Sequence, residues 1–224
     1  RERRELEKAI GRYVITAKDF RGEVRTMLVK SIEKRRRLLN ERYNRVIDEA
    51  ADRESEVRDD AIARFESFIK KYPDDRKRTP DAMYRLGDLY YEKSEDVYFR
   101  AEMKKDKLLA LYERGKLAEM PKEPMKDYKN SLRIWRKLLT KFGNKHRFAA
   151  PVYYLIGYIL AEQGDDDKAI AAWDTLLKLK KDKIKRFAGE VILRMGEIYF
   201  DEGDFAKAGE VYKKALNYKE NKYY

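Results

Sequence analysis

The feature that most limits the fold of this chain is an internal repeat, in which one helical pattern returns after 38 or 39 residues. Gly157 and Gly196 stand 39 residues apart, and each follows a large apolar residue. Trp135, Trp173 and Tyr212 succeed one another at spacings of 38 and 39 residues. Self-similarity at such a period is typical of stacked supersecondary units. We therefore expect an array of repeated units in place of one deep core.

Each unit combines small and bulky residues in a way that favours close packing of two helices. A glycine in the first helix removes the side chain that would hold a neighbouring helix away. The second helix begins with a small residue, Ala169 or Ala208, and carries Trp173 or Tyr212 four positions later. Residues four apart lie on one helical face, so they can interlock with the first helix. The pattern predicts stacked helical hairpins, and a plain helical bundle is the alternative.

These units resemble the tetratricopeptide repeat, whose pattern has a Leu-Gly pair, a Tyr, an Ala, an aromatic residue and a late Pro. The resemblance covers residues 58–218 and implies an all-α solenoid of helical hairpins that binds other polypeptides. The first repeat matches in its second helix only, and the fourth matches most fully. The matching positions, from first repeat to fourth, are Ala61, Phe65, Phe68 and Pro73; Met83, Leu86, Gly87, Tyr90, Ser131 and Trp135; Tyr153, Ile156, Gly157, Ala169 and Trp173; and Ile192, Met195, Gly196, Tyr199, Ala208, Tyr212 and Ala215.

The first 57 residues differ from the array that follows them. They contain no proline, and their apolar residues recur three or four positions apart, which is a helical period. This pattern predicts long helices with coiled-coil character over residues 1–57, either as one helix or as a helical hairpin. Gly22 is the candidate end of a first helix, because glycine weakens a helical pattern. We expect the repeat array to occupy residues 58–224.

An extended helical insertion, near residues 94–126, separates the two helices of the second repeat. A short turn belongs at this place in a tetratricopeptide repeat, and the second helix with Trp135 arrives late instead. We expect both helices of this repeat to lengthen into a projecting hairpin. Its apolar stripe would comprise Tyr98, Phe99, Leu108, Leu109, Leu111 and Tyr112.

The residue composition offers little to an enzyme. The 224 residues include no Cys and a single His, His146, which is most simply a turn residue at a helix end. A metal site would depend almost wholly on carboxylates, and the "GDDDK" stretch at 164–168 lacks the ligand spacing of a calcium loop. No phosphate-binding loop, dinucleotide fingerprint or nucleophile elbow is found. We expect no catalytic residue, no metal and no cofactor.

The net charge of +12 raises the question of an anionic partner. The strongest basic run is "LKLKKDKIKR", residues 177–186, and its patch comprises Lys178, Lys180, Lys181, Lys183, Lys185 and Arg186. Cations also favour a helix C-terminus, which is the simpler explanation of the run. The alternative is a basic adaptor that contacts nucleic acid or, peripherally, an anionic membrane surface. No aromatic platform for bases adjoins the run, and no window approaches the roughly 20 apolar residues of a membrane span.

The family resemblance also implies a binding groove, lined by the first helices of successive repeats. Carried over by position, the groove comprises Tyr84, Asp88 and Tyr91 from the second repeat, Tyr154, Tyr158 and Ala161 from the third, and Glu197 and Phe200 from the fourth. Aromatic rings with a few carboxylates suit a partner segment with apolar anchors and Lys or Arg. We expect about half of this set to pack between repeats instead.

A finer resemblance concerns the whole layout, a long helical N-terminus followed by repeats longer than the usual 34 residues. It is similar to repeat proteins of the bacterial envelope: the Tol–Pal periplasmic repeat protein, the β-barrel assembly repeat lipoprotein and gliding-motility scaffolds. The implied function is a non-enzymatic scaffold for subunits of an envelope or motility complex. Its place would be the periplasm or outer membrane of a Gram-negative bacterium, with the cytoplasm as the alternative. The chain opens within a helical pattern and without Met, so we expect any targeting segment to lie outside it. The oligomeric state stays open.

Overall fold

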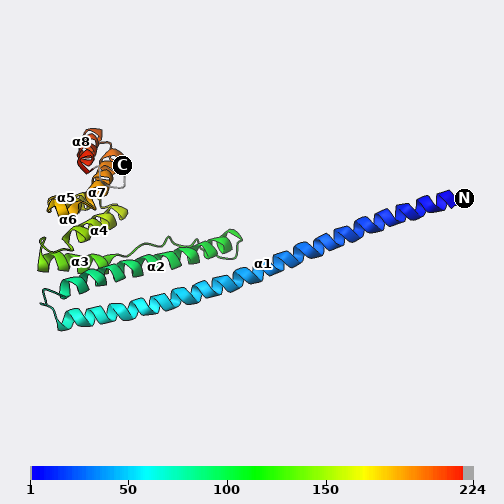
Figure 1. Cartoon of the computed structure of the whole chain (residues 1–224), viewed down its shortest axis with the longest axis horizontal. Coiled ribbons are helices and arrows are strands. Elements are labelled where there is room, and N and C mark those ends of the chain that lie inside the picture. The colour runs from blue at the N-terminus through cyan, green and yellow to red at the C-terminus, as the bar shows by residue number, and fades with distance from the viewer. Residues whose placement is uncertain (1, 219–224) are drawn as a thin grey trace. The chain divides into compact units, whose positions relative to one another are not determined.

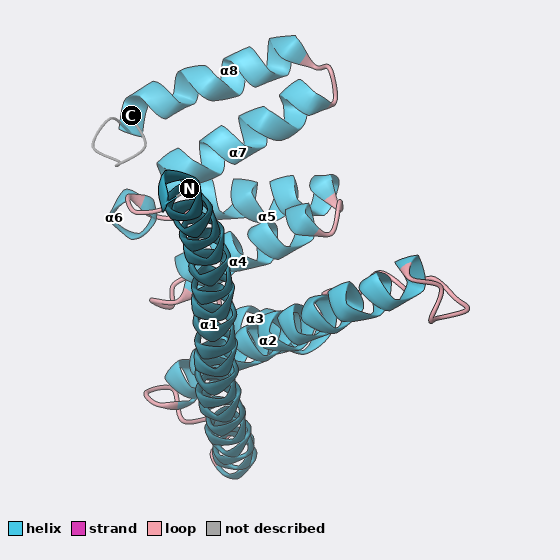
Figure 2. Ribbon diagram, turned by 90° about the vertical axis from the view of Figure 1, so that its right-hand side faces the viewer, coloured by secondary structure: helices cyan, strands magenta, loops and turns pink. Residues whose placement is uncertain are grey.

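The computed structural model describes residues 2–218, and over this range the protein is all-α without a strand (Figures 1 and 2). This confirms the fold class expected from the sequence. The predicted array extends to residue 224, and its last six residues lie outside the described range. The elements are α1 (Glu2–Lys71), α2 (Thr79–Glu113), α3 (Lys129–Phe142), α4 (Ala149–Glu162), α5 (Asp166–Leu177), α6 (Lys181–Ile184), α7 (Ala188–Asp201), α8 (Phe205–Ala215) and a 3₁₀ turn (Leu216–Tyr218).

The chain divides into two units, residues 1–57 and residues 58–224. Within the described residues, the first unit contains only the part of α1 before residue 58, and Gly22 does not end a helix within it. A glycine inside a helix costs about 1 kcal/mol relative to alanine, which weakens the helix without stopping it. The Thr26 hydroxyl donates a hydrogen bond to the Gly22 carbonyl oxygen over 2.9 Å, within the unbroken helix. The helical hairpin considered for residues 1–57 is therefore wrong.

In the second unit, the helices pack as consecutive hairpins: α2 with α3, α4 with α5, and α7 with α8. Neighbouring hairpins meet through α3 with α4 and through α5 with α7. The end of α1, residues 58–71, packs antiparallel on α2. The Tyr90 hydroxyl donates to Glu66 over 2.6 Å, and the Lys93 ammonium donates to Asp59 over 2.7 Å. This order of contacts is that of a helical-hairpin solenoid.

The interlock of small and bulky residues is present in every hairpin. A Cβ atom at Gly157 would lie 2.2 Å from the Trp173 ring nitrogen, a distance that two atoms not bonded to each other cannot hold. Gly87 and Trp135 stand in the same relation, at 2.0 Å. Both indoles are fully buried, and the Trp173 N–H donates to the Tyr154 carbonyl oxygen over 3.2 Å. Only glycine therefore fits at these points in the first helix of a hairpin.

Glycines with positive φ close the first helices of the third and fourth repeats. Gly164 follows α4 with φ 73°, and Gly203 follows α7 with φ 82°. This left-handed conformation is one that glycine adopts without steric cost, and it ends a helix by satisfying its last carbonyls. After α7, the Asp204 N–H donates to the Tyr199 carbonyl oxygen over 2.9 Å. The Asp204 carboxylate then caps α8 by accepting from the Lys207 N–H over 3.0 Å.

The insertion lengthens one helix of the second repeat and not both. α2 continues to Glu113, whereas residues 114–128 return without helix before α3 begins at Lys129. Gly115 leaves the helix with φ 69°, and the prolines at 121 and 124 prevent a helical return. The expectation of two lengthened helices is therefore wrong for the second helix.

The return segment is tied back to α2. The Ser94 hydroxyl donates to the Asp127 carbonyl oxygen over 2.6 Å, and the Lys105 ammonium donates to Glu123 over 2.6 Å. Three of the six residues in the predicted apolar stripe are half-buried, and the other three are exposed. The half-buried residues are Tyr98, Leu108 and Leu109, and the exposed ones are Phe99, Leu111 and Tyr112.

Candidate partner-binding face

The residues predicted for the groove come from the first helices α2, α4 and α7 and recur three, four or seven positions apart on each. Residues at this spacing lie along one stripe of a helix. We call the three stripes together the inner face of the repeats. It comprises Tyr84, Asp88 and Tyr91 on α2, Tyr154, Tyr158 and Ala161 on α4, and Glu197 and Phe200 on α7.

The tyrosines of α2 are half-buried and pack between repeats. The Tyr84 ring stacks on Phe148 with centroids 4.4 Å apart, and the Tyr91 ring stacks on Tyr128 at 5.3 Å. Burial raises the pKa of both hydroxyls above the usual value, so they stay protonated at neutral pH. Near Tyr84, the charges of Arg85 and Arg186 act against this rise.

The tyrosines of α4 are also half-buried and reach toward α7. The Tyr154 hydroxyl donates to Glu190 over 2.8 Å, and its ring lies 5.1 Å from that of Phe187. The Tyr158 ring lies 4.9 Å below the Arg194 guanidinium, a cation–π arrangement. Each of these rings holds neighbouring repeats together, while its remaining surface contributes to the inner face.

The Asp88 carboxylate has no cation at close range, and 24% of its side chain is exposed. The paired cation, Arg85, approaches only to 4.0 Å. Burial raises the pKa of Asp88 to about 6; the charge of Arg85 lowers the pKa, and that of Glu92 adds to the rise. A carboxyl in this state would gain from a cation or a hydrogen-bond donor brought by a partner.

Glu197 and Phe200 are the exposed members of the inner face. Phe200 is 56% exposed, and its ring meets the edge of Phe205 with centroids 5.1 Å apart. The exposed Phe200 ring keeps apolar surface in contact with water, which is unfavourable. A bound partner would cover this surface. These two residues are therefore the most accessible of the set.

A hollow of about 710 Å³ lies at the N-terminal ends of these helices, and we call it the basic hollow. Its charged lining residues are Arg85, Arg147, Lys183, Arg186 and Asp81, so cations outnumber acids four to one. The rings of Tyr84, Phe148, Tyr154 and Phe187 and the side chains of Pro151 and Leu155 form the rest of the lining. The charge here is opposite to the one expected from the sequence, which pointed to a partner rich in Lys or Arg.

A second hollow, of about 430 Å³, lies toward the C-terminal ends of α4 and α7, and we call it the acidic hollow. Its carboxylates come from Asp166, Glu197, Asp201 and Glu202, and its one cation is Arg194. Arg194 is already engaged, because its Nε donates to Glu190 over 3.2 Å. The two hollows give the inner face opposite charges at its two ends.

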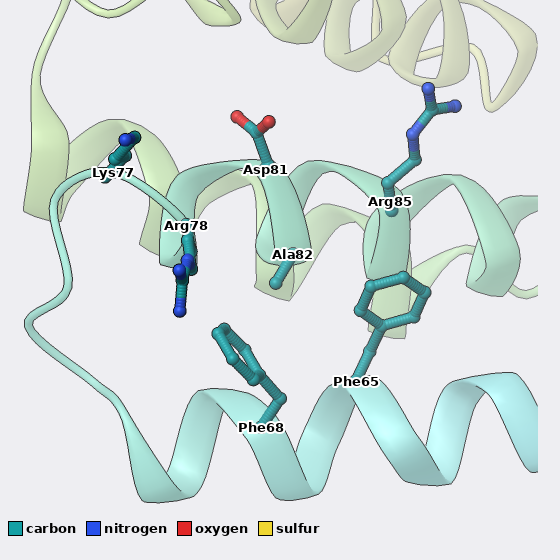
Figure 3. A pocket seen from close by; sticks show the side chains of 7 residues that line it. All are labelled: Phe65, Phe68, Lys77, Arg78, Asp81, Ala82 and Arg85. Carbon is teal, nitrogen blue, oxygen red and sulfur yellow. The ribbon is translucent and has the colours of Figure 1, made fainter.

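A third hollow, of about 520 Å³, lies between residues 65–68 of α1 and the start of α2 (Figure 3). Phe65 and Phe68 point from α1 toward α2, and Ala82 faces them. Asp81 and Arg85 project from the opposite side of α2, away from the two phenylalanines (Figure 3). Lys77, Arg78, Asp81 and Arg85 complete the lining of this third hollow, and Asp81 and Arg85 also line the basic hollow.

The basic run at 177–186 is only partly exposed. It contains the short helix α6, whose Ile184 is buried. The Lys183 ammonium is turned inward and donates to the carbonyl oxygen of Lys145 over 2.5 Å. The remaining residues of the predicted patch are exposed: Lys178, Lys180, Lys181, Lys185 and Arg186.

Sequence reasoning missed a polar cluster that joins α2, the return segment and α4. The Tyr128 ring is fully buried, and its hydroxyl is shared between Glu162, at 2.9 Å, and Glu95. The Lys126 ammonium lies 3.2 Å from both carboxylates. Burial and these carboxylates raise the pKa of Tyr128. Glu95 and Glu162 stand 33 and 34 positions from Tyr128, so no local spacing could have revealed the cluster.

His146 lies in the turn before α4, where its Nδ1 accepts from the Phe148 N–H over 3.4 Å. Burial lowers the pKa of its imidazole. Within residues 2–218, no group of three or more His, Cys, Asp or Glu side chains is placed to hold a metal ion. In the same range, no helix has an apolar stretch long enough to cross a membrane.

Comparison with protein-family models identifies the repeats. One tetratricopeptide-repeat model matches residues 150–183 and 189–222, and a second matches residues 50–97. The chain belongs to the tetratricopeptide-repeat family. The first model matches the third and fourth repeats, and the second matches the helix pair formed by the end of α1 and the start of α2. Such repeats are protein-interaction modules.

Among curated proteins, the chain is similar over part of its length to the photosystem I assembly protein Ycf3 from two strains of Prochlorococcus marinus. The identities are 37% over 67 residues and 35% over 68 residues, about 30% of this chain in each case. The matched segments span 38% of the length of these relatives. No solved structure matched the chain. These findings do not support the finer likeness to bacterial-envelope proteins.

Proposed function

We propose that the protein is a non-enzymatic scaffold that binds a segment of a partner protein along the inner face of its tetratricopeptide repeats. The observation that carries this proposal is the state of Glu197 and Phe200. They are exposed on the same stripe that, in the preceding repeats, is filled by packed tyrosines. Glu197 and Phe200 therefore present a carboxylate and an exposed ring on the inner face, and a bound partner segment would cover both.

The relatives support a scaffold role of a particular kind. The two curated proteins are named for the assembly of photosystem I, and the likeness to them spans about 30% of this chain. We propose by analogy that this protein holds subunits of a larger complex together while that complex forms. An envelope complex of a Gram-negative bacterium remains our proposed setting, and fractionation of host cells into periplasm, membrane and cytoplasm tests it.

The experiment that tests the scaffold role compares two matched double variants in the native host. The first, Glu197→Lys with Phe200→Ala, changes the inner face. The second, Glu210→Lys with Phe99→Ala, makes the same changes at exposed residues of α8 and of the insertion, outside the inner face. Partners recovered with each protein are quantified by mass spectrometry.

We expect the inner-face variant to lose specific partners at least about ten-fold, whereas the control variant keeps them. Equal recovery with both variants would exclude the inner face as the binding surface. The alternative of a basic adaptor is tested by binding to DNA and to anionic vesicles, which should weaken steeply with salt if the exposed lysines near α6 make the contact.

A further inference from the structure

The two ends of the inner face differ in charge, and α4 contributes a residue to each of the two hollows. On α4, Tyr154 lines the basic hollow and Ala161 lines the acidic hollow, seven residues further along. On this helix the two positions are about 10 Å apart, at 1.5 Å per residue. One extended or helical segment of a partner is long enough to reach both hollows.

Not every cation of the basic hollow is available to a ligand. Arg147 pairs with Asp81 and lies 4.7 Å over the Phe148 ring. Lys183 is held by backbone carbonyl oxygens of the turn before α4. Arg147, whose side chain is 67% exposed, and Lys183 are therefore already paired, and both contribute to the positive potential of the hollow.

Among the described residues that line the hollow, two guanidinium groups lack a close carboxylate partner. The Arg85 side chain is 69% exposed, and its nearest carboxylate is the distant Asp88 at 4.0 Å. Arg186 is exposed as well, and its closest ring contact is Phe187, at 6.0 Å. Within residues 2–218, no carboxylate lies within salt-bridge distance of Arg186. Arg85 comes from α2 and Arg186 from the segment before α7, and both line the basic hollow.

The floor of the same hollow is aromatic and apolar, with Tyr84 stacked on Phe148 and Tyr154 tilted on Phe187. A guanidinium group binds a carboxylate. The aromatic lining beside it would contact an apolar part of the same acidic residue, or an apolar side chain next to that residue. The volume of about 710 Å³ holds several side chains, which is more than a small inorganic anion needs. The hollow therefore fits an acidic peptide segment with an apolar anchor.

The acidic hollow shows the opposite preference. Asp166, Glu197, Asp201 and Glu202 face the single cation Arg194, which already serves Glu190 and Tyr158. A basic side chain entering here would meet carboxylates that lack a full complement of cations. An acidic side chain placed here would be repelled, so the two hollows discriminate against a segment in the wrong orientation.

We propose that the inner face recognises a bipolar segment of its partner, with acidic residues seated in the basic hollow and basic residues at the acidic hollow. This proposal rests on the scaffold function above and adds the chemistry and orientation of the bound segment. The charge pattern fixes which end of the segment lies toward the start of α4 and α7 and which lies toward their ends.

The test uses fluorescent peptides of about twelve residues, long enough to span both hollows when extended. The bipolar peptide carries Glu at one end, an aromatic and aliphatic centre, and Lys at the other end. A scrambled peptide of the same composition alternates Glu and Lys, and a third peptide has Lys at both ends. Binding to the full chain is measured by fluorescence polarisation at low and moderate salt.

We expect the bipolar peptide to bind at least about ten-fold more tightly than the scrambled one. The double variant Arg85→Glu with Arg186→Glu should lose this advantage and should bind the peptide with Lys at both ends better than the wild type does. The matched control, Lys178→Glu with Lys181→Glu, makes the same change in charge at exposed lysines outside both hollows. It should leave the advantage of the bipolar peptide intact.

Three results would overturn the proposal. The first is that the bipolar peptide does not bind, or binds no better than the scrambled one. The second is that the control variant abolishes the preference as fully as the Arg variant does. The third is that inorganic phosphate, at equal occupancy of the basic hollow, displaces the peptide. If any of these occurs while the Glu197 and Phe200 variant still loses its partners in the host, the scaffold function stands and only the bipolar recognition falls. If the partners also remain bound, both proposals fail.

Discussion

Residues 1–57 and the repeat array are both helical, yet they bury their apolar residues to very different degrees. In α1, Leu28, Ile32 and Leu39 recur at helical spacing and stay exposed. In the array, residues at comparable spacing, such as Leu138 and Ile159, are fully buried. The difference lies in what faces them, because each array helix meets a partner helix with complementary small and bulky residues. A helical period therefore specifies a helix, whereas burial requires a matching surface.

The largest expected effect comes from removing equivalent side chains in the two regions. Leu138→Ala should destabilise the array by about 2 to 5 kcal/mol, because it removes buried contacts and leaves a cavity. Leu39→Ala, at an exposed position of α1, should change the free energy of unfolding by less than about 0.5 kcal/mol. Chemical denaturation followed by tryptophan fluorescence and far-UV circular dichroism measures both. A large loss at Leu39 would show that α1 packs on another chain in solution.

The second comparison makes one substitution, glycine to alanine, in both regions. At Gly157 the new Cβ would meet the buried Trp173 ring, so Gly157→Ala should destabilise the array by about 2 to 3 kcal/mol. At Gly22 nothing lies within 4 Å of the new Cβ, so the gain in helix propensity should stabilise α1 by about 0.5 to 1 kcal/mol. Opposite signs in thermal unfolding would establish the difference, and the same sign at both sites would refute it.

The third prediction concerns charge, since the array can bury a carboxylate and α1 cannot. The pKa of Asp88 is raised from its usual value of 3.8 to about 6, so the folded protein binds this proton more tightly than the unfolded chain does. The associated stability is complete below about pH 4 and is lost as the pH rises through 6. Asp88→Asn should therefore stabilise the array at pH 7 by about 1 to 3 kcal/mol and have little effect near pH 4.

Unfolding curves recorded between pH 4 and pH 8 measure this dependence, and the exposed Asp48 of α1 supplies the matched Asp→Asn control. A constant difference between the Asp88 variant and the wild type across this range would mean that the carboxyl is not desolvated in the folded protein.

The smallest expected effect is at Ser131, which holds the small-residue position taken by Ala169 and Ala208 in the next two repeats. Its hydroxyl is buried, and within the described residues it has no hydrogen-bond partner. Ser131→Ala should stabilise the second repeat by about 1 kcal/mol. Ser31→Ala, at an exposed position of α1, serves as the reference for helix propensity. A destabilised Ser131 variant would indicate that the hydroxyl is hydrogen-bonded in solution.

Much of the array could be predicted from the sequence because its determinants are local. The spacing of Gly157 and Trp173 encodes the interlock, and a glycine after each first helix encodes the turn. The inner face could be placed by the same periodicity, although whether it binds a partner is still to be tested. The insertion was predicted wrongly in its second half, because the prolines at 121 and 124 prevent the helical return that we expected. The ties at Ser94 and Lys105 accompany the return that the chain adopts.

The sequence by itself determined the helices, their repeat and the positions at which hairpins interlock, because these depend on the periodicity and size of neighbouring residues. Only the tertiary structure decided the charge of the surfaces between repeats. Arg85, Arg147 and Arg186 come from three separate segments, and only stacking brings them around one hollow. Likewise, Tyr128 meets Glu95 and Glu162 across two repeats. Electrostatic contacts depend on distance in space, which no spacing along the chain encodes.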